Sequence, residues 1–324
     1  MKLFDRLKQR AMQNKKTIVF PEGTEPRVLK AVARLQQENL VQAILLGKQS
    51  DIAAQADKLG LDLTGVQTID PDNYADYDKM CADFVERRAG KNTLEQAQEW
   101  LKEPSYFGTM LVYEKIADGM VSGAVHSTAN TVRPALQIIK TKPGQKRVSG
   151  AMLLEKGSEL LVFADCAMNI DPDSATLAEI ARQSATTAKM AGLEPQIAML
   201  SFSTKGSAKS PLVDKVTKAT ELAHEQDPDL ALDGELQFDA AYVPEVGSLK
   251  APDSKVAGHA NVFVFPDLQA ANIGYKIAQR LGGYTAVGPV LQGLAAPIND
   301  LSRGAKVEDI YLTGVLTAAQ AQED

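Results

Sequence analysis

The sequence has 324 residues, of which 44% are hydrophobic and 23% charged, so it can bury a large core and favours two domains. Its net charge of -6 argues against a general nucleic-acid binder, which would carry a basic stripe. No apolar run reaches the ~20 residues of a membrane helix, residues 1–13 lack the apolar region of a signal peptide, and the two cysteines have no zinc or redox spacing. The composition predicts a soluble, cytoplasmic protein without nucleic-acid or membrane partners.

Strand-like and helix-like segments alternate over the first 143 residues. Strands are predicted at 16–22 and 41–47, and helices at 24–40, 50–60, 77–91 and 93–104. Thr24 and Ser50 are the expected N-caps of the first two helices, and Gly60 is expected to end the second. This alternation is typical of a parallel sheet flanked by helices.

After residue 143 the pattern changes and then resumes. Residues 148–169 read as an antiparallel hairpin with a Lys-Gly turn. Strands are then predicted at 196–204, 230–238, 261–266 and 284–294, and helices at 173–192, 210–226, 239–249, 267–283 and 307–322. The final helix can pack back on the first part of the chain. We therefore predict two α/β domains with mostly parallel sheets, a discontinuous one of residues 1–143 plus 293–324 and a second of residues 144–292.

Several motifs are absent from the sequence. It contains no G-x-G-x-x-G, no G-x-x-x-x-G-K-[ST], no G-x-S-x-G and no H-E-x-x-H. Its three histidines are isolated from one another, so a histidine metal centre or a Ser-His pair is not indicated. Any chemistry would depend on arginine, serine, aspartate and the backbone.

The segment "HSTANTVRPALQIIKT" combines an arginine with several hydroxyls. Because Arg133 precedes a proline, it is expected at the mouth of a helix that begins at Pro134. There its charge would add to the helix dipole and favour an anion, with Ser127, Thr128 and Thr131 nearby. A capped helix with a solvated arginine explains the same residues, and spacing alone favours it.

Three cations gather in the last part of the helix predicted at 77–91. Arg87, Arg88 and Lys91 lie near its end, where cations usually complement the dipole and face water. The local pattern favours that structural role for all three.

Two further groups of polar residues lie after residue 143. Cys166 directly follows a strand, where ligand clefts open in α/β sheets, although a lone cysteine there is more often a small buried hydrophobe. Asp233, Glu235 and Asp239 could suggest a metal site, but alternation in a half-exposed strand explains the first two without one.

The segment "APINDLSRGAKVEDI" follows an almost chargeless stretch. Ser302 and Arg303 are adjacent, and Gly304 leaves room for a ligand to approach closely. Asp309 lies near the start of the last helix, where an acid also stabilises the helix dipole. The local pattern leaves a turn and a site equally open.

Long motifs together resemble one family along essentially the whole chain: "HSTANTVRPALQIIKTKPG", "DCAMNIDPD", "LSFSTKGSA", "DGELQFDAA", "NVFVFPDLQAANIGYK" and "GPVLQGLAAPINDLSRG". The chain looks like a short, single-module phosphate acetyltransferase of the phosphate acetyl/butyryltransferase family. The resemblance implies reversible acetyl transfer between acetyl phosphate and coenzyme A, with phosphate as the other product. It also implies a two-domain fold like isocitrate and isopropylmalate dehydrogenase with a cleft between the domains, a homodimer, and no metal or other cofactor.

The resemblance also implies roles for single residues. Asp309 matches the base that deprotonates the thiol, Arg303 the arginine that holds the phosphoryl group and the carbonyl, and Ser302 the hydroxyl that stabilises the oxyanion. Substrate-binding positions are matched by Arg133, Arg88, Ser127, Thr128, Thr131 and Cys166, the last lying near the site without being the nucleophile. Arg88 fits the family's E-x-R-x-x-K spacing better than Arg87 does.

Two departures from the family pattern bear on the mechanism. Asn130 stands where the family often has Asp, and Ala305 and Lys306 stand where it often has Cys or Ser, which rules out a cysteine acyl-enzyme at that position. Direct thiolate attack in a ternary complex is therefore expected. The alternatives are a butyryl- or propionyl-specific relative, a non-catalytic acetyl-coenzyme A-sensing module, and a metal-dependent dehydrogenase of the same fold class.

Overall fold

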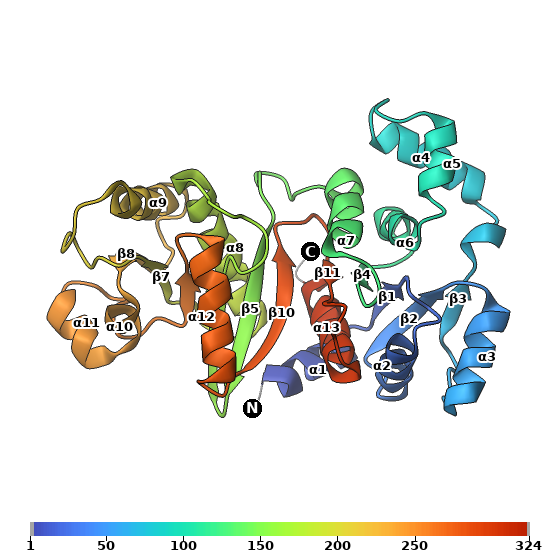
Figure 1. Cartoon of the computed structure of the whole chain (residues 1–324), viewed down its shortest axis with the longest axis horizontal. Coiled ribbons are helices and arrows are strands. Elements are labelled where there is room, and N and C mark those ends of the chain that lie inside the picture. The colour runs from blue at the N-terminus through green and yellow to red at the C-terminus, as the bar shows by residue number, and fades with distance from the viewer. Residues whose placement is uncertain (1–2, 323–324) are drawn as a thin grey trace. The chain divides into compact units, whose positions relative to one another are not determined.

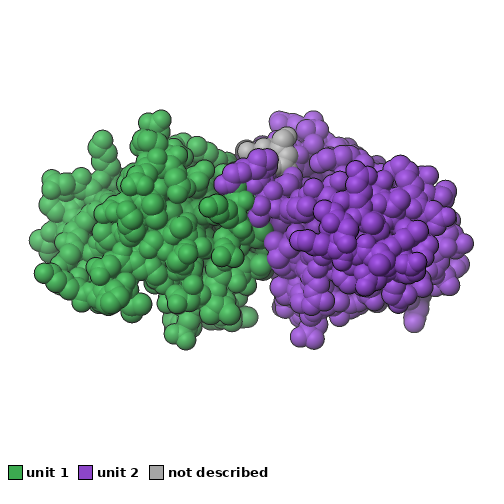
Figure 2. All heavy atoms as spheres, turned by 90° about the horizontal axis from the view of Figure 1, so that it is seen from above, with its two compact units in different colours: residues 1–3, 145–293 green, residues 4–144, 294–324 purple. Residues whose placement is uncertain are grey.

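The computed structural model describes residues 3–322 and shows a mixed α/β chain (Figure 1). The chain forms two compact units, coloured separately in Figure 2. Unit 1 comprises Met1–Leu3 and Gln145–Gly293, and unit 2 comprises Phe4–Gly144 and Leu294–Asp324. Within residues 3–322 no helix is both long and apolar enough to cross a bilayer.

Unit 2 is built on a five-stranded sheet in the order β11-β4-β1-β2-β3, in which every pair is parallel. Its strands are β1 Lys16–Phe20, β2 Val41–Leu46, β3 Gln67–Ile69, β4 Gly119–Ser122 and β11 Ile298–Asp300. Its helices are α1 Leu3–Gln13, α2 Pro26–Gln37, α3 Gln49–Leu59, α4 Tyr77–Arg87, α5 Leu94–Trp100, α6 Pro104–Tyr113, α7 Thr128–Pro134 and α13 Val307–Gln320, with a 3₁₀ turn at Pro71–Asn73 and a π-helical turn at Ala135–Ile139.

Alternate strand residues in unit 2 meet helices on opposite faces of the sheet. A Cβ at Gly314 of α13 would lie only 3.4 Å from Phe20 Cζ and 2.7 Å from Leu35 Cδ1, so α13 packs tightly on β1 and α2. On the other face, a Cβ at Gly108 of α6 would come within 2.9 Å of Met120 Sδ. The sheet is therefore buried on both sides, as its apolar strands require.

Unit 1 has a six-stranded sheet in the order β10-β5-β6-β9-β7-β8. Its strands are β5 Ser149–Lys156, β6 Glu159–Ala164, β7 Ile197–Leu200, β8 Leu232–Leu236, β9 Val262–Val264 and β10 Thr285–Gln292. Its helices are α8 Ser174–Met190, α9 Pro211–Gln226, α10 Phe238–Tyr242, α11 Pro244–Lys250 and α12 Leu268–Arg280. The β10-β5-β6 part is antiparallel and the rest parallel, and α12 covers the face opposite α8 (Figure 1).

Two local predictions are confirmed. The hairpin of β5 and β6 pairs antiparallel across the predicted Lys-Gly turn. Gly60 ends α3 in the left-handed conformation, with φ 64°.

Other local predictions are wrong. Glu25, not Thr24, caps α2, because its carboxylate accepts the Arg27 N–H; α3 starts at Gln49 without a cap from Ser50. The helix predicted at 239–249 is two helices, since Pro244 starts a new one. The "IND" segment, for which the pattern indicated no strand, is the short strand β11.

Candidate active site

The ends of three strands in unit 2 bring polar residues to one edge of its sheet. Asp300 ends β11, Ser122 ends β4, and Glu22 follows β1 by two residues. Because these strands are parallel neighbours, their carboxyl ends share an edge, where α/β sheets usually bind ligands. The loops that follow carry Ser302, Arg303 and the segment 123–133.

A buried carboxylate fixes one of these loops. Glu22 is 7% exposed and accepts the backbone N–H groups of Gly123, Ala124 and Val125 at 3.2, 3.0 and 3.0 Å. The chain between β4 and α7 is thereby held in place. Glu22 was not predicted to belong to the site, although an acid directly after a buried strand was the available signal.

An arginine joins this loop to the loop after β11. The guanidinium of Arg27 donates to the carbonyls of Ala124, Arg303 and Ala305 at 2.8, 2.9 and 2.8 Å. Its Nε pairs with the Glu25 carboxylate at 2.6 Å. Arg27 therefore positions the backbone of residues 303–305, a role that no sequence pattern indicated.

The side chains on this fixed backbone are exposed. Within residues 3–322 the guanidinium of Arg303 has no hydrogen-bond or ion-pair partner. The hydroxyl of Ser302 accepts the Gly304 N–H at 3.3 Å and keeps its own proton to donate. A guanidinium and a hydroxyl thus lie side by side, and no carboxylate among residues 3–322 pairs with the guanidinium.

Asp309 is the third residue of α13. One carboxylate oxygen accepts the Lys306 N–H at 2.8 Å, so the residue does stabilise the helix start, as the alternative interpretation expected. The other oxygen has no hydrogen-bond donor among the described residues. The neighbouring Glu308 instead pairs with Arg34 at 2.5 Å. The helix start therefore engages only one of the two oxygens of Asp309 among the described residues.

Asp300 accepts a hydrogen bond from a hydroxyl that the resemblance assigned to substrate. The Thr128 hydroxyl donates to its buried carboxylate at 2.6 Å, and Thr131 is itself buried. Burial raises the pKa of Asp300, the nearby charge of Glu22 raises it further, and the hydroxyls of Thr128 and Thr131 oppose the shift. Thr128 thus binds the sheet edge, whereas Ser127 is exposed and donates to Asn130 at 2.5 Å.

The predicted placement of Arg133 at a helix mouth is wrong. Arg133 lies in the last turn of α7, which begins at Thr128 and includes Pro134. The helix does not break at the proline because it passes into the wider π-helical turn of Ala135–Ile139. The helix dipole therefore does not assist an anion at Arg133, but its exposed guanidinium has no partner among residues 3–322.

The adjacent arginines at the end of α4 have different roles. Arg87 donates to the carbonyls of Ile138 and Ile139 at 2.5 and 2.9 Å and lies over the Tyr113 ring, so the prediction that it faces water is wrong. Among the residues that the structure describes, Arg88 makes one hydrogen bond, from its Nε to Asn92 at 2.9 Å, which leaves the rest of its guanidinium able to donate.

The pKa of Lys140 shows that positive charge accumulates around the end of α4. Its pKa is lowered first by burial and then by the neighbouring cations Arg87, Lys91 and Arg88. An excess of cations of this kind favours an anionic ligand.

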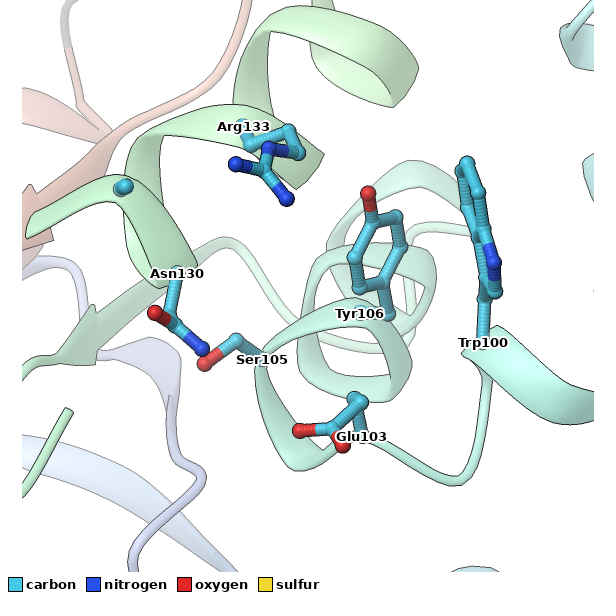
Figure 3. Close-up of a pocket in the computed structure, with 7 residues that line it drawn as sticks. Trp100, Glu103, Ser105, Tyr106, Asn130 and Arg133 are labelled. Atoms are coloured by element: carbon cyan, nitrogen blue, oxygen red, sulfur yellow. The ribbon is translucent and has the colours of Figure 1, made fainter. Parts of the chain in front are cut away.

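A pocket of about 320 Å³ opens beside Arg133 (Figure 3). The residues that line it come from the end of α5, the connection to α6, α6 itself and α7: Trp100, Glu103, Ser105, Tyr106, Ala129, Asn130 and Arg133. Its aromatic residues were not predicted to belong to the site.

Comparison with known proteins decides the family. A phosphate acetyl/butaryl transferase family model matches residues 2–318. The chain belongs to this family. It is 56% identical over 319 residues to the phosphate acetyltransferase of Bacillus subtilis (strain 168), covering 98% of this chain and 99% of that protein.

Solved structures of this family agree with the fold. The crystal structure of a phosphotransacetylase from Streptococcus pyogenes matches with a TM-score of 0.97 and 59% identity, over 99% of this chain and 98% of that one. A branched-chain phosphotransacylase from Enterococcus faecalis V583 matches with a TM-score of 0.69 at 19% identity, over 94% and 99%, and so supports the fold alone.

Cys166 of this family member lies in unit 1. Its thiol is buried and donates to the Phe163 carbonyl at 3.3 Å. Burial, followed by the nearby charge of Asp165, raises the pKa of the thiol well above its ordinary value. The residue is therefore a thiol rather than a nucleophilic thiolate.

The acids of the family motif "DGELQFDAA" are each partnered. Asp233 pairs with Lys205, and Asp239 pairs with Lys250 at 2.8 Å. Glu235 is only 4% exposed and accepts hydrogen bonds from the Ser203 hydroxyl, the Gly206 N–H and the Thr217 hydroxyl at 2.9, 2.8 and 3.0 Å. The half-exposed strand expected from alternation is thus wrong at Glu235.

Proposed function

We propose that this family member transfers an acetyl group reversibly between acetyl phosphate and coenzyme A, with Ser302, Arg303 and Asp309 as the catalytic residues. Relatives named phosphate acetyltransferase are 54–57% identical over nearly the full chain and support this activity. The structural observation that carries the residue assignment is the unpaired Arg303 guanidinium on a backbone fixed by Arg27.

In the proposed reaction, Asp309 accepts the thiol proton of coenzyme A and the thiolate attacks the carbonyl carbon of acetyl phosphate. A C–S bond forms, and the negative charge on the carbonyl oxygen is stabilised by the Ser302 hydroxyl and the Arg303 guanidinium. The tetrahedral intermediate then collapses, the C–O bond to phosphate breaks, and Arg303 holds the departing phosphate. The transfer is direct, since Ala305 offers no nucleophile for an acyl-enzyme.

The proton transfer sets the main energetic demand. Moving a proton from an ordinary thiol to an ordinary carboxylate is uphill by about 4 pKa units, or roughly 6 kcal/mol. An arginine beside the sulfur stabilises the thiolate and reduces this cost. Binding both substrates in one site makes the attack effectively unimolecular. No step calls for a metal, and we propose that the reaction needs no cofactor.

The reaction is tested by mixing purified protein with acetyl phosphate and coenzyme A, without added metal and with a chelator, and following thioester absorbance. Thioester formation supports the proposal, and its absence contradicts it. Butyryl phosphate in a parallel reaction tests the other acyl group of the family, since a higher kcat/KM with butyryl phosphate would reassign the substrate. Exchange of labelled phosphate into acetyl phosphate without coenzyme A would contradict direct transfer.

We further propose a cytoplasmic homodimer formed through α12. Ile273, Ile277 and Leu281 are 54, 52 and 85% exposed and recur every four residues, so one face of this helix is apolar and uncovered. A second copy would cover it by a two-fold contact. Ile277→Glu should shift the mass measured by light scattering from dimer to monomer.

Two free thiols, Cys81 and Cys166, suit a reducing compartment.

A further inference from the structure

The first turn of α13 carries the proposed general base on one side of the helix. Asp309, Thr313 and Thr317 recur every four residues and so form one row along α13. This row lies along β11, because the side-chain amide of Asn299 donates to the Thr317 hydroxyl at 2.9 Å. β11 leads into the loop that carries Arg303. The rotation of α13 about its own axis therefore decides the direction of the Asp309 carboxylate.

The opposite face of α13 is bound to α2. Tyr311 is two residues from Asp309 and so lies about 200° further around the helix. Its side chain is fully buried, and its hydroxyl donates to the Glu38 carboxylate at 2.5 Å. Gly314 lies on the same face, where an added Cβ would come within 2.7 Å of Leu35 Cδ1 of α2. Close packing and a hydrogen bond together fix this face of the helix.

Glu38 accepts hydrogen bonds from three helices. Besides the Tyr311 hydroxyl of α13, it binds Nε of Arg34 in α2 at 2.8 Å and Nζ of Lys8 in α1 at 3.3 Å. Burial raises the pKa of Glu38, but the hydrogen bonds from its three donors outweigh burial and lower the pKa below its ordinary value. An ionised acceptor where α1, α2 and α13 meet strengthens each of these bonds.

The two cations also hold the ring of Tyr311. The guanidinium carbon of Arg34 lies 3.7 Å from the ring centroid, and Lys8 Nζ lies 5.0 Å from it, so both make cation–π contacts. Arg34 also pairs with Glu308, but that carboxylate is 55% exposed, and an exposed pair contributes little. The buried bond between Tyr311 and Glu38 is therefore the main polar link between α13 and α2.

We infer that Tyr311 and Glu38 are positioning residues for the general base Asp309. They fix the rotation of the first turn of α13, so the Asp309 carboxylate meets the thiol proton in one direction. Tyr311 is buried and acts through the helix rather than on the substrate. Because a misplacement of about 1 Å can slow a reaction by about 10²-fold, this support has a measurable effect on turnover. The inference rests on the proposed function and adds to it the support of the base.

A double-mutant cycle tests whether Tyr311 acts through Asp309. Tyr311→Phe should lower kcat by about tenfold, less than the loss for a displacement of about 1 Å, and leave the KM values for acetyl phosphate and coenzyme A unchanged. In a protein that already carries Asp309→Asn, the same substitution should change kcat by less than about twofold, because no base remains to be positioned. An equal fold-loss in both backgrounds would overturn the inference, and so would the absence of any loss from Tyr311→Phe.

Glu38 gives a second test through a different side chain. Glu38→Ala removes the acceptor of three donors and should lower kcat at least as much as Tyr311→Phe does. Glu38→Gln keeps an oxygen that accepts the Tyr311 hydroxyl and should restore much of the lost kcat. If Glu38→Gln is as slow as Glu38→Ala, the bond to Tyr311 does not support turnover and the inference is wrong.

Tyr242 provides the matched control. Its hydroxyl also donates to a carboxylate, that of Glu159, but in unit 1. Tyr242→Phe should leave kcat unchanged, even where urea unfolding shows that it loses as much stability as Tyr311→Phe. Equal losses of kcat in the two variants would contradict the inference, because turnover would then follow stability alone. Wild-type turnover without the Tyr311 effects overturns the positioning role alone, and no thioester formation by the wild type overturns the proposed function.

Discussion

Two loops of the molecule contain the same types of residue in the same order but differ in whether the cation has a partner. Residues 301–306 follow β11 in unit 2, and residues 201–208 follow β7 in unit 1. Each has a hydroxyl residue, a cation and a glycine in succession, Ser302-Arg303-Gly304 and Thr204-Lys205-Gly206.

The fixed parts and the free parts of the two loops are different. In unit 1 the ammonium of Lys205 pairs with Asp233 and donates to the Gly234 carbonyl. The carboxylate of Glu235 accepts the Gly206 N–H and so holds the loop backbone. In unit 2 the backbone is held by Arg27, while the Arg303 side chain has no partner among the described residues. Similar residue types therefore carry different roles, and the unpaired cation marks the candidate site.

The largest effect is expected at Asp309. Asp309→Asn should lower kcat by about 10²- to 10⁴-fold, the usual contribution of a general base. The amide oxygen can still accept the Lys306 N–H, so the start of α13 should persist. Glu308→Gln removes a neighbouring acid that pairs with Arg34 and serves as the matched control in steady-state kinetics. Comparable losses in both variants would assign Asp309 to the helix start alone.

The two adjacent arginines give the next contrast. Arg88→Gln should raise the KM for coenzyme A about tenfold or more, because it removes a charged hydrogen-bond donor from the anion site. Arg87→Gln should instead lower the free energy of unfolding by about 1–3 kcal/mol, since the carbonyls of Ile138 and Ile139 lose their donors. Urea unfolding and steady-state kinetics on both variants test this. A loss of stability in Arg88→Gln together with a raised KM in Arg87→Gln would contradict the assignment.

In the unit 1 loop a much smaller effect is expected. Lys205→Met breaks a partly exposed ion pair and should change the free energy of unfolding by about 1 kcal/mol or less. Its kcat should match that of the wild type. A loss of turnover as large as that of an Arg303 variant would remove the distinction between the two loops.

The smallest expected effect is a pH dependence of stability from Asp300. Since burial raises its pKa, the folded protein keeps this proton over a range in which the unfolded chain has lost it, so stability falls as pH rises from about 4. Asp300→Asn retains an acceptor for Thr128 and removes this loss. Urea unfolding at several pH values should show the wild type losing stability relative to the variant; a difference independent of pH would contradict this.

Much of the fold is encoded locally and could be predicted. The apolar strands and helices, the hairpin and the Gly60 cap follow from periodicity and turn chemistry. The strand β11 was missed because it has only three residues, two of which are polar, and these become a strand only by pairing with β4. The likeness to isocitrate dehydrogenase stays a prediction.

The site could be predicted in part. Ser302, Arg303 and Asp309 stood out through their motif, and the structure brings the first two onto one fixed loop. Glu22 and Arg27 were missed because their partners are more than 90 residues away in the sequence, so no local pattern reveals them.

Steady-state kinetics of Arg303→Lys test the central claim most directly. Lysine keeps the charge but not the bidentate geometry for phosphate and oxyanion. The account predicts that kcat for acetyl transfer falls by about 10²- to 10³-fold while the KM values for acetyl phosphate and coenzyme A change far less. A variant with wild-type kcat would contradict it, because the unpaired guanidinium would then have no part in the reaction.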